Sequence, residues 1–164
     1  MVVGITGHQK LEEKDCWLWV ESVIRTALAE VPRPLVGVSS LAIGADQLFA
    51  KLVLESGGCL EVVTPFPGYW QTFTPGQARA EYQSLLDRAS RVDVLPPRDN
   101  WEESYLAAGQ LVVERSDLMI AVWNGKTAVG LGGTGDMVRY ARQLSRKVLH
   151  IDPSQSLHLT PAAP

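Results

Sequence analysis

Short apolar runs alternate with stretches of helical periodicity along most of the chain. The runs predict strands at residues 2–6, 35–39, 60–65, 92–95, 118–122 and 148–151. Because these runs are apolar throughout rather than alternating with polar residues, they indicate a sheet buried on both faces. Such a pattern is typical of a parallel sheet that helices cover.

Apolar residues at helical spacing fill the segments between the runs. The stripes predict helices around residues 17–31, 45–53, 82–89 and 137–144, and the flanking segments predict another at 102–115. Strict alternation of strand and helix implies right-handed crossovers between parallel strands. We therefore predict an α/β fold: a three-layer, Rossmann-like, doubly wound and mainly parallel sheet of about six strands flanked by helices.

One domain accounts for the periodic part of the chain. A length of 164 residues suffices for one compact core and is too short for two. We place the domain at residues 1–152 and expect residues 153–164, which lack periodicity, to form a flexible C-terminal tail. The segment 65–76 is rich in proline and glycine, so we expect a long irregular loop on the functional side of the sheet.

Composition narrows the possible function classes. The net charge of -3 argues against a surface that coats nucleic acid, but it leaves specific binding of one small anion open. No apolar run approaches the roughly 18 residues of a membrane helix, and no secretory leader precedes the first strand, so we expect a cytoplasmic protein without membrane contact. Cys16 and Cys59, the latter at the start of a predicted buried strand, are expected to be reduced thiols. No cluster has metal-ligand spacing, so we predict no metal site and no required cofactor.

Three loops at the carboxyl ends of predicted strands carry the candidate chemistry, because ligands bind at that edge of an open parallel sheet. They follow the first, second and fifth strands and contain the motifs GITGH, SSLAIGAD and GLGGTGD. The candidate ligand-binding residues in them are Gly7, His8, Gly44, Ala45, Asp46, Gly132, Gly133, Thr134, Gly135 and Asp136.

The glycines between residues 130 and 135 predict a phosphate cradle. Four of these six residues are glycine, and they lie just before the last predicted helix. Without Cβ atoms the backbone can approach a ligand, and the first N–H groups of a helix are unpaired and attract anions. Thr134 adds a hydroxyl donor or a helix cap. The alternative is that the glycines only make a tight turn, but two glycine-bearing helix starts on one sheet edge favour ligand binding.

The side chains beside these turns each have two interpretations. Asp46 and Asp136 either interact favourably with a helix dipole or accept hydrogen bonds from ribose hydroxyls. His8 either donates to a phosphate or packs within its loop. The loop aromatics either stack on a base or form a lid or a subunit contact; they are Tyr69, Trp70 and Phe73.

Three further side chains suggest surface roles. Arg79 is expected at the surface, with contact to a phosphate as the alternative. Trp17 and Trp19 look exposed on the first helix, which suggests a homodimer formed through that helix.

Taken together, the motifs GITGH, SSLAIGADQLFA, SDLMIAVWNG and GLGGTGDMVRYA resemble the SLOG superfamily over residues 1–152. That group includes the Lonely guy phosphoribohydrolases, the lysine decarboxylase-like proteins, the molybdenum cofactor carrier proteins and the Rossmann domain of DNA processing protein A. The resemblance implies a Rossmann-like fold, a nucleotide or nucleotide-derived ligand and often a homodimer.

The chain departs from the catalytic pattern of the phosphoribohydrolases. Those enzymes use a glutamate shortly after their Gly-Thr turn and an arginine on the preceding helix, and the resemblance places Met137 and Ala108 at these positions. A thioether cannot act as nucleophile or base, and alanine cannot bind phosphate. Asp136 is adjacent to Met137 but points elsewhere, because neighbours on a helix lie about 100° apart.

Three functions therefore compete. The first, which the departures favour, is binding of a nucleotide or phosphorylated sugar as a carrier or sensor, without hydrolysis. The second is a nucleoside monophosphate N-glycosidase in which Asp136 or Asp46 acts as a shifted acid. The third is a protein-interaction module whose pocket is vestigial.

Overall fold

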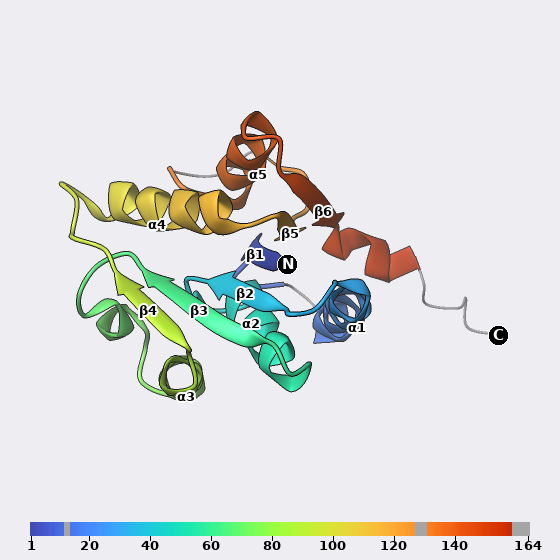
Figure 1. The fold of residues 1–164 in the computed structure, drawn as a ribbon, viewed down its shortest axis with the longest axis horizontal. Coiled ribbons are helices and arrows are strands. Elements are labelled where there is room, and N and C mark those ends of the chain that lie inside the picture. Colours follow the sequence, from blue (N-terminus) through green and yellow to red (C-terminus); the bar gives the residue numbers. More distant parts are fainter. Residues whose placement is uncertain (12–13, 127–130, 159–164) are drawn as a thin grey trace.

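The computed structural model describes residues 1–11, 14–126 and 131–158 and contains a six-stranded sheet (Figure 1). All neighbouring strands pair in parallel, in the order β4-β3-β2-β1-β5-β6. The strands are β1 Val2–Gly7, β2 Val36–Ser39, β3 Cys59–Thr64, β4 Arg91–Val94, β5 Leu118–Val122 and β6 Lys147–Ile151. Each lies within a residue or two of a predicted apolar run, so the predicted α/β fold class is confirmed.

Helices cover both faces of the sheet and complete three layers (Figure 1). One layer contains α1 Lys14–Glu30, α2 Ala45–Glu55 and α3 Gln77–Asp87. The opposite layer contains α4 Trp101–Arg115 and α5 Thr134–Gln143. This distribution follows from the topology, because right-handed crossovers place helices on opposite faces once the direction of strand addition reverses.

The apolar core is divided by the sheet, as the uniformly apolar strands predict. Val3 and Ile5 of β1 pack against Val20, Ile24 and other apolar residues of α1 and α2. A second cluster lies under α4 and α5 and includes Val112, Met119 and Met137. Because both faces of the central strands are buried, the sheet is a rigid platform for the loops that leave its carboxyl edge.

Two short 3-10 helices lie where the sequence predicts irregular chain. The helix η1, Tyr69–Thr72, lies within the proline- and glycine-rich segment after β3. The helix η2, Pro153–His158, begins the expected tail and contacts α1. Among the described residues, no helix is both long and apolar enough to cross a bilayer.

Two expectations from the sequence about the solvent exposure of side chains are wrong. Trp17 and Trp19 are partly buried against the core under α1, and the exposed apolar side chain there is Leu18, which is 67% exposed. The pair therefore gives no argument for a helix-mediated dimer. Cys59 is exposed because it is the first residue of β3, outside the part that helices cover.

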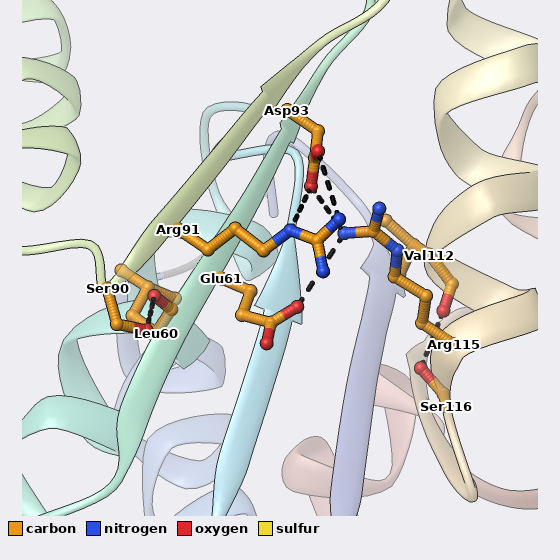
Figure 2. A network of polar contacts seen from close by, with 8 residues as sticks. All are labelled: Leu60, Glu61, Ser90, Arg91, Asp93, Val112, Arg115 and Ser116. Carbon is orange, nitrogen blue, oxygen red and sulfur yellow. Dashed lines mark hydrogen bonds and ion pairs between the residues drawn. The ribbon is translucent and has the colours of Figure 1, made fainter.

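A cluster of charged side chains lies beside β3 and β4, where α4 ends (Figure 2). Arg115 Nη1 lies 2.6 Å from Asp93 Oδ2 and 3.6 Å from Glu61 Oε2, and Arg91 also contacts Asp93. Arg115 is the main reason that the pKa of Asp93 is lowered. None of these residues lines the cavity described next, so the cluster joins α4 to the sheet.

Candidate ligand-binding cavity

Strands β2 to β4 lie on one side of β1, and β5 and β6 lie on the other, so the direction of strand addition reverses between β1 and β5. A cavity of about 790 Å³ opens at the carboxyl ends of these two strands. Loops after β1, β2, β3 and β5 form its walls together with α4 and the start of α5. Such a switch point is where open α/β sheets bind ligands. The topology thus brings seven of the ten candidate ligand-binding residues, which the sequence places in separate loops, to one cavity.

The loop after β1 is hydrogen-bonded to the end of β5 and to the start of α2. The His8 backbone N–H donates to Val122 O at 3.0 Å, and His8 O accepts from the Ala45 N–H at 3.1 Å. His8 Nε2 accepts from the Asn124 N–H at 3.3 Å, so a neutral ring carries its proton on Nδ1. Gly7 is required for packing, because a Cβ there would lie 2.6 Å from the Cβ of Ala45. Gly7 and His8 line the cavity, and both interpretations of His8 remain compatible with its position.

Gly44 allows α2 to begin directly against this loop. Its φ of +89° lies in the left-handed region, and a Cβ would lie 2.5 Å from His8 O. Gly44 thereby brings Ala45 and Asp46 to the edge of the sheet. Neither Gly44 nor Ala45 lines the cavity itself, so their contribution is to the shape of the wall.

Asp46 is buried and lines the cavity. Its Oδ2 accepts hydrogen bonds from Ser39 Oγ at 3.0 Å and from the Ser40 N–H at 3.1 Å. Burial raises the pKa of the Asp46 carboxyl to about 6, against these hydrogen bonds, which lower it. A carboxyl with a strongly shifted pKa in a cleft is a functional-site candidate.

In the glycine turn before α5, one N–H group is already bound by the side chain of Asp136, a residue of α5. The Gly132 N–H donates to Asp136 Oδ2 at 3.2 Å, and Asp136 Oδ1 accepts from Arg139 at 3.1 Å. Asp136 does not line the cavity, whereas Gly132, Gly133, Thr134 and Gly135 do. The N–H groups of the last three find no acceptor among the described residues. Gly130, the first glycine of the predicted cradle, lies outside them.

The cavity floor beside this turn is apolar. Met137 is 3% exposed and Ala108 is 2% exposed, and both line the cavity within the core cluster under α4 and α5. A Cβ on Gly109 would lie 2.5 Å from Met137 Sδ, so α4 and α5 are in close contact here. No carboxylate or guanidinium stands at the two positions that the phosphoribohydrolase pattern requires.

Lys126 also lines the cavity, although the sequence analysis did not select it. Its carbonyl accepts from Trp123 Nε1 at 2.7 Å and its N–H donates to Asn124 Oδ1 at 3.2 Å, so the backbone is held in place. Within the described part of the chain its ammonium has no carboxylate partner. Its position just after a predicted parallel strand was the signal that could have identified it.

The aromatic residues separate into two groups. Tyr69 and Phe73 are buried in the core and also line the cavity, as does Tyr105 of α4. Trp70 points elsewhere: the Arg79 guanidinium lies 4.1 Å from its ring centroid, outside the cavity. Two of the three predicted loop aromatics therefore form the wall, and Arg79 has the surface position expected of it.

Several solved structures share this fold. DNA processing protein A from Streptococcus pneumoniae superposes with a TM-score of 0.65 at 21% identity, over 95% of this chain and 54% of that chain. The Helicobacter pylori protein, whose structure is described for its single-stranded DNA binding mode, gives a TM-score of 0.65 at 18% identity, over 96% and 71%. The molybdenum cofactor carrier protein from Chlamydomonas reinhardtii gives 0.53 at 15% identity, over 93% and 79%.

These matches confirm the Rossmann-like fold that the sequence motifs predict. The chain spans about half the length of the pneumococcal protein, and identities this low establish a shared fold only. No family model matches the sequence, and no curated protein matches it.

Proposed function

We propose that this protein binds a nucleotide or a nucleotide-derived phosphorylated ligand in the cavity at the β1/β5 switch point, as a carrier or sensor. The single observation that carries the proposal is the cavity of about 790 Å³ at that point, which is within the usual size range of small-molecule sites. The molybdenum cofactor carrier protein among the structural neighbours is consistent with a carrying role.

The phosphate has a suitable partner at one end of the cavity. Thr134 and Gly135 begin α5, where unpaired N–H groups and the helix dipole favour an anion. Lys126 adds a positive charge to the same loop connection, between β5 and α5. These groups have nothing to bind within the described residues, so an anionic ligand would satisfy them.

Hydrolysis of the ligand has less support than binding alone. Met137 occupies the expected position of the catalytic glutamate, and Asp136 is turned toward Gly132 and Arg139 instead of the cavity. Asp46 does line the cavity, but three donors from the end of β2 and the loop before α2 already bind its carboxylate. Among the described residues, no group of His, Cys, Asp and Glu is placed to hold a metal ion that could activate water.

A single-stranded nucleic acid is the second candidate ligand, because the Helicobacter neighbour binds single-stranded DNA. The overall charge of -3 supports it less than it supports a single nucleotide, since strand binding requires a basic groove. A nucleotide and a short oligonucleotide therefore belong in the same assay.

Isothermal titration with nucleoside monophosphates and an oligothymidylate tests the proposal. We expect at least one monophosphate to bind and to raise the melting temperature. At a ligand concentration one hundred times Kd, the free energy of unfolding should increase by about 2.7 kcal/mol. Lys126→Gln should weaken that binding, while Lys147→Gln, at the opposite edge of the sheet, should not. Absence of binding for every nucleotide would contradict the proposal and favour an interaction module.

A further inference from the structure

The cavity has two chemically different ends. The connection between β5 and α5 contributes Lys126 and the N–H donors at the start of α5, which attract an anion. The end at α2 offers Asp46, a buried carboxylate 7% exposed, which attracts hydrogen-bond donors and repels anions. A ligand that satisfies both ends carries a negative charge at one extremity and an N–H or O–H donor at the other.

The Asp46 carboxylate retains capacity for a further donor. A carboxylate has about four acceptor positions. The Ser39 hydroxyl and the Ser40 and Ala42 N–H groups supply three donors, from the last residue of β2 and the loop that follows it. Because Asp46 lines the cavity, a ligand group that donates a hydrogen bond would fill the remaining position.

The surroundings of Asp46 suit a planar ring. Tyr69 lines the same cavity as Asp46, and the pKa of its hydroxyl is raised mainly by burial and further by the charge of Asp46. The Tyr69 ring lies 5.0 Å from Phe73 and 6.0 Å from Tyr105, centroid to centroid, and all three rings line the cavity. Aromatic walls of this kind bind nucleobases by stacking, which is tolerant of base identity.

The sheet sets the distance between the two ends. Asp46 follows β2 and the start of α5 follows β5, and these strands are separated by β1 alone. Two interstrand spacings amount to about 10 Å. A span of this order accommodates either the ribose or the base of a 5′-nucleotide at the α2 end, and the aromatic rings that line the cavity favour the base there.

We propose that Asp46 recognises the exocyclic amino group of a nucleotide base that lies against Tyr69, Phe73 and Tyr105, with the phosphate at the start of α5. This inference rests on the proposed function and adds the class of base. Adenine, guanine and cytosine carry such an amino donor, whereas uracil and hypoxanthine do not. In this proposal Asp46 contacts the base and not the ribose hydroxyls, which were one of its two interpretations from the sequence.

Paired nucleotides that differ only in the amino group provide the test. AMP is compared with purine riboside 5′-monophosphate, GMP with IMP, and CMP with 2-pyrimidinone riboside 5′-monophosphate, each by isothermal titration. In at least one pair we expect the amino-bearing nucleotide to bind about tenfold to a hundredfold more tightly, the usual range for a hydrogen bond to a charged group.

Variants assign the discrimination to Asp46. In Asp46→Asn the amide oxygen can still accept from Ser40, which turns the amide NH₂ toward the cavity, so the preference within the pair should vanish or reverse. Asp87→Asn, the same substitution on the exposed face of α3, should keep the preference. The wild-type comparison needs no variant and remains decisive if Asp46→Asn does not fold.

Each outcome separates this inference from the proposed function. Equal binding within every pair would leave the proposed function intact and overturn the role of Asp46. A preference that survives Asp46→Asn, or a preference for AMP over 2′-deoxy-AMP without any effect of the amino group, would also overturn it. If no nucleotide binds, the proposed function fails and this inference fails with it.

Discussion

The Asp136 carboxylate accepts a hydrogen bond from the Gly132 N–H across 3.2 Å. An acidic residue of α5 therefore binds an N–H group of the glycine turn that precedes this helix. Arg139 holds the other carboxylate oxygen at 3.1 Å. Asp136 therefore caps the turn, and a phosphate at this position must be bound by the amides that follow. The negative charge of Asp136 opposes such an anion.

Asp136→Asn should consequently tighten the binding of a nucleoside monophosphate. The amide oxygen can still accept from Gly132, while the repulsion is removed, so we expect a severalfold lower Kd at low salt and a smaller gain at high salt. Isothermal titration at two salt concentrations measures both. If Asp136 were instead the catalytic acid of a glycosidase, this variant would abolish release of free base.

Gly133→Val should eliminate nucleotide binding without unfolding the protein. Gly133 has φ of −70° and ψ of 169°, a conformation that valine adopts readily, so the backbone tolerates the substitution. The added side chain would block approach to the amides at the start of α5. Titration should show at least a tenfold loss of affinity, with the melting temperature of the free protein within a few degrees of wild type. Unchanged affinity would place the phosphate elsewhere.

Asp46 should make the protein less stable as the pH rises through 6. Its pKa is raised from 3.8 to about 6 in the fold, so the folded state binds this proton more tightly than the unfolded state does. The protonated carboxyl stabilises the fold fully at acidic pH, and the contribution is lost as the pH rises past the folded pKa. Relative to Asp46→Asn, wild type should gain about 1 kcal/mol in urea unfolding between pH 7 and pH 5. A pH-independent difference would contradict the assigned pKa.

Arg115→Gln should affect stability slightly and ligand binding not at all. The substitution removes the contacts of Arg115 with Asp93 and Glu61, which lie in a partly exposed cluster (Figure 2). Partly exposed ion pairs contribute under about 1 kcal/mol, and salt should reduce the effect further. The pKa of Asp93 should rise toward 3.8, which an NMR titration of its carboxyl would record. Weakened nucleotide binding would show that the cluster acts on the cavity.

The sequence by itself determined the elements and the edge at which the ligand site lies. Apolar runs such as Leu118–Val122 predict parallel strands from the local pattern alone, and the central strands are buried on both faces. Val92 and Val94 are exposed because β4 is an edge strand, which the local pattern does not reveal. Gly44 and Gly132 also act locally, since their positive φ angles are requirements of single turns. The carboxyl ends of the strands follow from chain direction alone, which is why Gly7, His8, Asp46 and Thr134 were found to line one cavity.

Only the tertiary structure decided what each of these side chains faces. Asp46 and Asp136 both occupy the first turn of a helix, yet one lines the cavity and the other is turned to Gly132 and Arg139. Tyr105 and Lys126 join the same cavity from distant positions in the chain. Trp17 and Trp19 are partly buried against the core instead of exposed. Side-chain direction depends on packing between elements that are remote in sequence, and local periodicity does not contain that information.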